Sequence, residues 1–88
     1  MTSIKSALVL GASRGIGRQI ALTLAENGYG VVVASKSTES TVKLPGSIFT
    51  VADEIRQNGG QAYPVKCDCR RHEDIGEAVK TTIEKYIS

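Results

Sequence analysis

A glycine-rich turn between an apolar run and a helical pattern is the feature that most constrains the fold of this chain. The turn covers residues 11–17 and reads Gly-Ala-Ser-Arg-Gly-Ile-Gly. The apolar run 7–10 precedes it, and the largely apolar stretch 19–25 follows it. This succession predicts a buried strand, a tight turn and an α-helix.

Each glycine of this turn has a separate physical use. Gly11 permits a tight turn, Gly15 leaves the backbone open to a pyrophosphate, and Gly17 lets the helix pack closely against the strand. The first amides of the helix lack internal partners and, together with the helix dipole, favour an anion. The motif and its flanks therefore predict dinucleotide binding, with a purely structural turn as the alternative.

Hydrophobic patterns along the rest of the chain predict alternating strands and helices. We expect strands at residues 5–10, 30–34 and 61–67, helices at 14–27, 48–57 and 73–87, and a polar loop at 35–47. Gly28 stands where a helix stop belongs, and Pro64 assigns the third strand to a sheet edge. The expected fold class is α/β: a Rossmann-type, doubly wound parallel sheet, represented by its first three strands and three helices.

Right-handed crossovers predict the sheet order third, second, first, with two helices on one face and the last helix on the other. Helical spacing predicts the buried faces of the helices. These faces are Ile16, Ile20, Ala21 and Leu24 in the first helix, Ile48, Val51, Ala52 and Ile55 in the second, and Ile75, Val79, Ile83, Tyr86 and Ile87 in the third.

The apolar first strand bears on domain organisation. Without a fourth strand beside it, residues 7–10 would form an exposed apolar edge, which natural proteins avoid. We therefore expect residues 1–88 to be the N-terminal portion of a longer Rossmann-fold domain, unless another chain covers this edge.

The turn resembles the Gly-x-x-x-Gly-x-Gly motif of the short-chain dehydrogenases/reductases, although Leu10 stands where that family usually has Thr. Residues 34–36, 43–48, 52–55 and 68–70 look most similar to the hydroxysteroid-dehydrogenase-like branch. The resemblance covers only the cofactor-binding half of such an enzyme. It implies an oxidoreductase that transfers a hydride between a nicotinamide cofactor and a carbonyl or alcohol.

The resemblance also implies the form of the cofactor. Arg14 corresponds to a basic residue that faces the 2′-phosphate of NADP, and guanidinium geometry suits a phosphate. Ser35 and Lys36 supply a hydroxyl and a cation where NAD-specific members need a carboxylate. We therefore expect NADP(H) over NAD(H), with Glu39 as the one nearby acid that would favour NAD.

The third strand ends in a second group of expected cofactor contacts. By resemblance, Asp68 contacts the adenine edge and the backbone at Cys69 flanks the ring, whereas the alternative role of Asp68 is to cap the last helix. The residues expected to bind the cofactor are Gly11, Ala12, Ser13, Arg14, Gly15, Ile16, Gly17, Ser35, Lys36, Asp68 and Cys69.

No residue of the chain is expected to be catalytic. The family's proton donor is a Tyr in a Tyr-x-x-x-Lys spacing, and Tyr29, Tyr63 and Tyr86 do not fit it. Two functions therefore stay open for the 88 residues: the NADP-binding portion of an oxidoreductase, or a non-catalytic NADP-binding module or truncated fragment.

A metal site is a weaker hypothesis. Cys67, Cys69 and His72 offer three ligands where structural zinc normally takes four, and a Cys-x-Cys pair in a strand would face one side. We expect no metal.

Composition limits the remaining functions. A formal net charge of +2, scattered along the chain, does not favour a nucleic-acid partner. No apolar run approaches the roughly 20 residues that span a bilayer, and the first strand begins too early for a signal peptide. Two cysteines with a single residue between them cannot form a disulfide that stabilises the fold. We therefore expect an intracellular, by default cytoplasmic, protein that takes a small-molecule carbonyl or alcohol substrate, with any homo-oligomer formed through segments outside these residues.

Overall fold

In the described part of the chain, three strands and three helices alternate, as the sequence predicts. The computed structural model describes residues 5–13, 15–36 and 47–87. In chain order the elements are β1 (Ser6–Leu10), α1 (Gly15–Glu26), β2 (Gly30–Ser35), α2 (Ile48–Gln57), β3 (Gln61–Lys66) and α3 (His72–Tyr86).

The strands form one parallel sheet in the order β1-β2-β3, which confirms the predicted order. Val9 of β1 pairs with Val33 of β2, and Val33 pairs with Pro64 of β3. Pro64 lies in an edge strand, where its missing N–H interrupts no second ladder. Among the described residues, β1 has β2 as its only neighbour, so the other edge of β1 has no pairing partner there.

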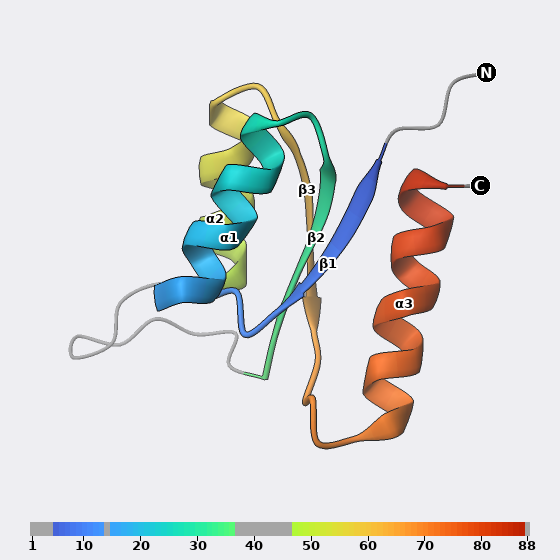
Figure 1. Cartoon of the computed structure of the whole chain (residues 1–88). Coiled ribbons are helices and arrows are strands. Elements are labelled where there is room, and N and C mark those ends of the chain that lie inside the picture. Colours follow the sequence, from blue (N-terminus) through green and yellow to red (C-terminus); the bar gives the residue numbers. More distant parts are fainter. Residues whose placement is uncertain (1–4, 14, 37–46, 88) are drawn as a thin grey trace.

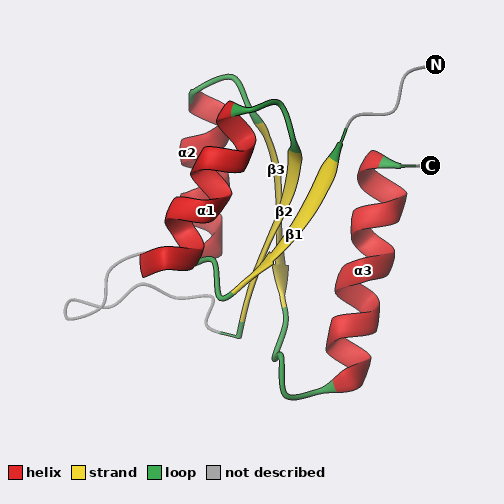
Figure 2. Cartoon of the chain, in the orientation of Figure 1, coloured by secondary structure: helices red, strands yellow, loops and turns green. Residues whose placement is uncertain are grey.

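The elements stack in three layers (Figure 1). Helices α1 and α2 lie on one face of the sheet and α3 lies on the other, as expected from right-handed crossovers. Figure 2 shows the sheet as the middle layer between red helices on both sides. Every residue of β2 is buried, because this central strand has a strand on each side and a helix layer on each face.

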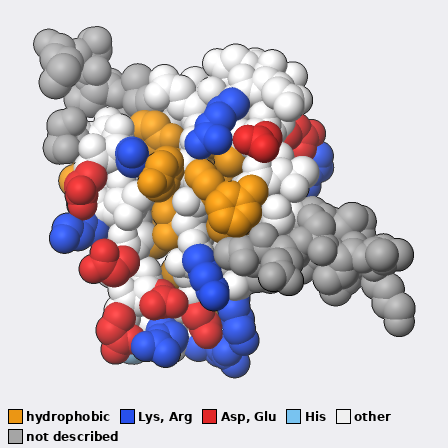
Figure 3. Space-filling view, turned by 180° about the vertical axis from the view of Figure 1, so that it is seen from behind, with side chains coloured by type: hydrophobic (Ala, Val, Ile, Leu, Met, Phe, Trp, Pro, Cys, Tyr) orange, Lys and Arg blue, Asp and Glu red, His pale blue; other side chains and the backbone are white. Residues whose placement is uncertain are grey.

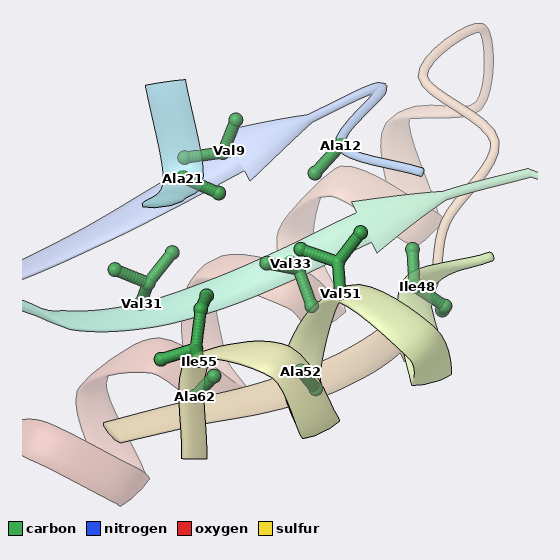
Figure 4. Close-up of a cluster of buried hydrophobic side chains, with 10 residues drawn as sticks. All are labelled: Val9, Ala12, Ala21, Val31, Val33, Ile48, Val51, Ala52, Ile55 and Ala62. Carbon is green, nitrogen blue, oxygen red and sulfur yellow. The ribbon is translucent and has the colours of Figure 1, made fainter. Parts of the chain in front are cut away.

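Apolar side chains fill both interfaces of the sheet. The larger cluster lies between the sheet and the α1–α2 layer (Figure 4). The four predicted core residues of α2 (Ile48, Val51, Ala52 and Ile55) are all buried in this cluster. A smaller cluster of Ala34, Cys67 and Ala78 joins the sheet to α3.

Local signals set the ends of the helices. Helix α1 ends before Gly28, which has a φ of +87° and confirms the predicted stop. The Ser47 hydroxyl caps α2 by accepting a hydrogen bond from the Thr50 amide at 3.2 Å. None of the helices in the described part of the chain is long and apolar enough to cross a membrane.

The predicted buried face of α3 is wrong in part. Val79 and Ile83 are each 44% exposed, and Ile87 is 52% exposed. The buried residues of α3 are Ala78 and Thr82, which precede Val79 and Ile83 by one position and lie about 100° away around the helix. Ile75 packs against the cluster of Ala34, Cys67 and Ala78, and Tyr86 packs over Gly30, so these two predictions are confirmed. Ala78 has a small side chain and packs in one buried cluster with Ala34 and Cys67.

The predicted face of α1 needs a similar correction. Ala21 is fully buried, and Leu22, Leu24 and Ala25 pack against the core around it. Ile20 lies one step of about 100° away from Ala21 and is exposed. Ile16, at the start of the helix, is 80% exposed. Burial on α1 is therefore set by its last two turns, and not by the isoleucines near its beginning.

Ile55 is buried and Ile83 is exposed, so replacing isoleucine by alanine should destabilise the protein strongly at position 55 and weakly at position 83. Ile55→Ala removes a core side chain and should lower the free energy of unfolding by about 2–5 kcal/mol. Ile83→Ala, the matched control on α3, should cost less than about 1 kcal/mol. Urea denaturation of both variants measures the difference. Equal losses would contradict the assignment of the buried face of α3.

Candidate functional site

The segments that follow the three strands lie together at one edge of the sheet, because parallel strands all end on the same side (Figure 1). The glycine turn follows β1, Lys36 follows β2, and Asp68 closely follows β3. Two backbone hydrogen bonds connect these segments at the strand ends. The Ala12 amide donates to the Ala34 carbonyl at 3.1 Å, and the Cys67 amide donates to the Ser35 carbonyl at 2.9 Å.

The glycine turn has the geometry that its sequence predicts. Gly11 and Gly15 have φ values of +68° and +65°, a region that side chains with a Cβ rarely adopt. Among the residues that the structure describes, a Cβ on Gly15 would meet no atom within 4 Å, so they leave open space at its backbone. A Cβ on Gly17 would overlap the Gly11 carbonyl oxygen. The start of α1 therefore lies directly against the turn, and the close contact of Gly17 is with Gly11 and Ala12 rather than with the strand itself.

The beginning of α1 suits an anionic ligand. The helix starts at Gly15, so its first amides have no partners inside the helix. Its first turn contains no acidic side chain that would compete with an anion for the positive end of the helix dipole. The open space at Gly15 borders the same first turn, so the residues present fit a phosphate group.

The side chains of the turn point in different directions. Ala12 is fully buried in the core, and Ser13 is also buried. The Ser35 hydroxyl donates a hydrogen bond to the Ser13 hydroxyl at 3.4 Å, which links the turn to the end of β2. Ile16 and Lys36 are exposed. Arg14, the expected phosphate contact, and Glu39 both lie outside the described residues.

Asp68 lies beyond the end of β3 in a dense set of hydrogen bonds. Its carboxylate accepts from the Arg70 amide at 3.0 Å, from Arg70 Nε at 3.1 Å and from Arg70 Nη2 at 3.0 Å. These bonds, followed by the charges of Arg70 and Lys36, hold the pKa of the Asp68 carboxyl well below its usual range. Asp68 therefore carries a full negative charge throughout the neutral and mildly acidic range.

Asp74, in the first turn of α3, and the backbone of Arg71 hold the connection between β3 and α3. The Asp74 Oδ2 accepts a hydrogen bond from the Asp68 amide at 3.0 Å, and the Arg71 amide donates to the Asp68 carbonyl at 2.9 Å. Arg71, and not Asp68, occupies the cap position of α3, so the alternative capping role of Asp68 is wrong. In Figure 3, acidic and basic side chains intermingle at the lower end of the molecule, around the start of α3.

The two cysteines lie in different surroundings. Strand β3 ends at Lys66, so the expectation that Cys67 and Cys69 face one side of a strand is wrong. Both thiols are free, but Cys67 is buried whereas Cys69 is exposed. Burial raises the pKa of the Cys67 thiol. In the described ranges, no three His, Cys, Asp or Glu side chains are grouped closely enough to hold a metal ion.

The tyrosines have packing roles in the structure. Tyr29 immediately precedes β2, and the Tyr86 ring packs over Gly30 at the start of that strand. Both therefore lie at the opposite end of β2 from Lys36. Tyr63 of β3 lies under the Lys85 ammonium, with Nζ 4.3 Å from the ring centroid.

Sequence reasoning missed the contacts of Arg70 and Asp74. One signal for the first was present, because Asp at the start of a turn commonly accepts from the amide two residues later. That spacing is Asp68 to Arg70. The bond from the Asp68 amide to Asp74 had no comparable signal, since it depends on how α3 returns toward the sheet.

The sheet with helices on both faces, together with the glycine turn, defines a Rossmann-type unit. The family model for short chain dehydrogenases matches residues 5–88. The chain therefore belongs to the short chain dehydrogenase family. It is 46% identical over 78 residues to hydroxysteroid dehydrogenase-like protein 2 of Bos taurus, which confirms the predicted resemblance to that branch.

Solved structures agree with this assignment. A short chain dehydrogenase of Mycobacterium thermoresistibile is 43% identical, with a TM-score of 0.85 over 92% of this chain. A 7α-hydroxysteroid dehydrogenase, solved with NADH and 7-oxo glycochenodeoxycholic acid, is 34% identical with a TM-score of 0.81. The chain spans 19% of the length of the bovine relative and 29% of each of these two solved chains.

The contact between Gly17 and the turn leads to a stability prediction. Gly17→Ala places a methyl group against the Gly11 carbonyl and should lower the free energy of unfolding by about 1–3 kcal/mol. Gly76→Ala is the matched control within a helix, where an added Cβ meets none of the described atoms within 4 Å. It should stabilise the protein by about 0.5–1 kcal/mol. Chemical denaturation measures both, and a neutral Gly17→Ala would contradict the close packing.

Proposed function

We propose that this chain is the NADP(H)-binding portion of a short-chain oxidoreductase that acts on a carbonyl/alcohol pair by hydride transfer. The observation that carries the proposal is the glycine turn, which borders open space at Gly15 in front of the first turn of α1. Family membership supports oxidoreductase chemistry. The NADH found with the 7α-hydroxysteroid dehydrogenase supports a nicotinamide cofactor.

The glycine turn would hold the pyrophosphate. Its backbone amides and the first amides of α1 donate hydrogen bonds to phosphate oxygens, and Gly15 lets the phosphate approach without a side chain between them. The buried Ala12 and Ser13 side chains keep the backbone of the turn in place. The bond between Ser13 and Ser35 then sets the distance between the turn and the end of β2.

Lys36 would select the phosphorylated cofactor. It is exposed at the end of β2, where a carboxylate would favour the free ribose hydroxyls of NAD. Its ammonium attracts a 2′-phosphate instead. Ser35 is buried and its hydroxyl bonds to Ser13, so its part is to fix the backbone next to Lys36. Arg14 is proposed as a second cation for the same phosphate.

Asp68 and Cys69 would complete the adenine end. The ionised Asp68 carboxylate accepts a hydrogen bond from the amino group of the adenine, and the backbone at Cys69 flanks the ring. The bound cofactor supplies the hydride acceptor or donor, while the residues described here bind and orient its adenosine half. The residues that move the proton and bind the substrate are proposed to lie outside this chain.

The proposed role of Lys36 predicts a change of cofactor preference. Lys36→Ala should weaken NADPH binding about tenfold or more, because a charged hydrogen bond is lost, and should leave NADH binding nearly unchanged. Lys80→Ala, an exposed lysine on α3, is the matched control and should change neither. Fluorescence titration with both cofactors measures this. Tighter binding of NADH than NADPH by the unsubstituted protein would contradict the NADP assignment.

The exposure of Cys69 provides a chemical test of the adenine site. Bound NADPH should slow alkylation of Cys69 by iodoacetamide, because the cofactor covers the backbone and side chain at that position. Cys67 is buried and should react slowly with or without cofactor. Peptide mass spectrometry quantifies the two thiols separately. An unchanged rate at Cys69 in saturating NADPH would place the adenine elsewhere.

A further inference from the structure

Arg70 donates hydrogen bonds to the Asp68 carboxylate from both its side chain and its backbone amide, although the side chain is largely exposed. The Arg70 side chain is 71% exposed, yet Nε and Nη2 each bond a different oxygen of the Asp68 carboxylate. The Arg70 amide adds a third bond, to Oδ1. The amide bond and the planar guanidinium together fix the orientation of the carboxylate, which a free aspartate could change by rotation.

A count of acceptor sites shows what remains for a ligand. A carboxylate offers about four lone-pair sites, two on each oxygen. Oδ1 accepts from the Arg70 amide and from Nε, so both of its sites are used. Oδ2 accepts from Nη2 and keeps one site. Within the described ranges, Asp68 is therefore an oriented acceptor for one further donor.

We propose that Arg70 is a positioning residue that gives the site its specificity for adenine, by holding Asp68 so that its one remaining acceptor site receives the 6-amino group. This inference rests on the proposed function. A base with an oxo group at position 6 presents an acceptor to the carboxylate, and two facing acceptors leave both unpaired. Arg70 prevents the carboxylate from turning to relieve this conflict.

A direct contact between Arg70 and the 2′-phosphate is the competing role. The guanidinium gives two of its five N–H donors to Asp68, so the other three could serve this role without breaking those bonds. Lys36 already supplies a cation at the end of β2, and its charge acts on the Asp68 carboxyl as well. The two roles make different predictions, because one concerns the base and the other concerns the phosphate.

The test therefore measures both preferences in the full-length protein. The ligands are NADPH, NADH and the hypoxanthine analogue of NADPH, which has an oxo group in place of the 6-amino group. The variants are Arg70→Ala and Arg70→Lys. The matched control is Arg71→Ala, which also removes one exposed positive charge but leaves the Asp68 carboxylate bonds intact.

The unsubstituted protein should prefer NADPH over its hypoxanthine analogue by about tenfold or more. Arg70→Ala should reduce this preference to less than about threefold, and Arg70→Lys should reduce it as well, since an ammonium keeps the charge but not the paired geometry. Arg71→Ala should keep the full preference. The ratio of NADPH to NADH affinity should be the same in the Arg70 and Arg71 variants.

A second measurement tests the positioning without any cofactor. Carbon-13 NMR of the Asp68 carboxyl should show a pKa that rises toward the ordinary value of about 3.9 in Arg70→Ala and stays low in Arg71→Ala. The sign follows from the bonds to Arg70, which favour the ionised carboxylate. The charges near this carboxyl are Arg70 and Lys36, while Asp74 contacts the adjacent amide.

Three results would overturn the inference. The first is an unchanged base preference in Arg70→Ala. The second is a loss of NADPH over NADH preference in that variant with the base preference kept, which would assign Arg70 to the phosphate. The third is equal binding of the two bases by the unsubstituted protein, which removes the adenine contact but leaves NADP binding intact. Failure of the unsubstituted protein to bind any of the three ligands would instead refute the proposed function itself.

Discussion

The arrangement of this molecule depends on the two backbone hydrogen bonds at the ends of its strands. One joins Ala12 to Ala34, and the other joins Ser35 to Cys67. Because they tie the segment after each strand to the neighbouring strand, the glycine turn, Lys36 and Asp68 lie at one edge in a fixed order. These bonds hold the short side chains and bare amides at this edge in place, as the proposed cofactor site requires.

Some residues of the glycine turn pack against the protein, whereas Gly15 is open to its surroundings. Ala12 and Ser13 face inward, and Gly17 lies against the Gly11 carbonyl, so the turn is held from behind. Gly15 borders open space at the start of α1. The same absence of a side chain therefore allows a tight contact at Gly17 and, in the proposed cofactor site, would give a phosphate access at Gly15.

Charge at this edge is distributed between strands. Lys36 follows β2 and Asp68 follows β3, and in the proposed function this cation and this anion would contact the phosphate and the amino group of the cofactor. Arg70 bonds both carboxylate oxygens, which keeps Asp68 ionised and oriented. Asp74 holds the backbone of the same residue from the first turn of α3. The last helix is thus part of the support of the site, although it lies on the opposite face from α1.

The sequence by itself determined the order of elements, the parallel sheet, the edge position of Pro64 and the glycine turn, because these follow from local apolar periods and from residues with restricted backbone chemistry. It also indicated Lys36 and Asp68 through their places after strands. Only the tertiary structure decided that Ala78 and Thr82 of α3, and not Val79 and Ile83, face the sheet, since that depends on how closely the sheet's own side chains let the helix approach. The support of Asp68 by Asp74 likewise arises only when α3 returns to the sheet edge, and periodicity along one helix does not record that contact.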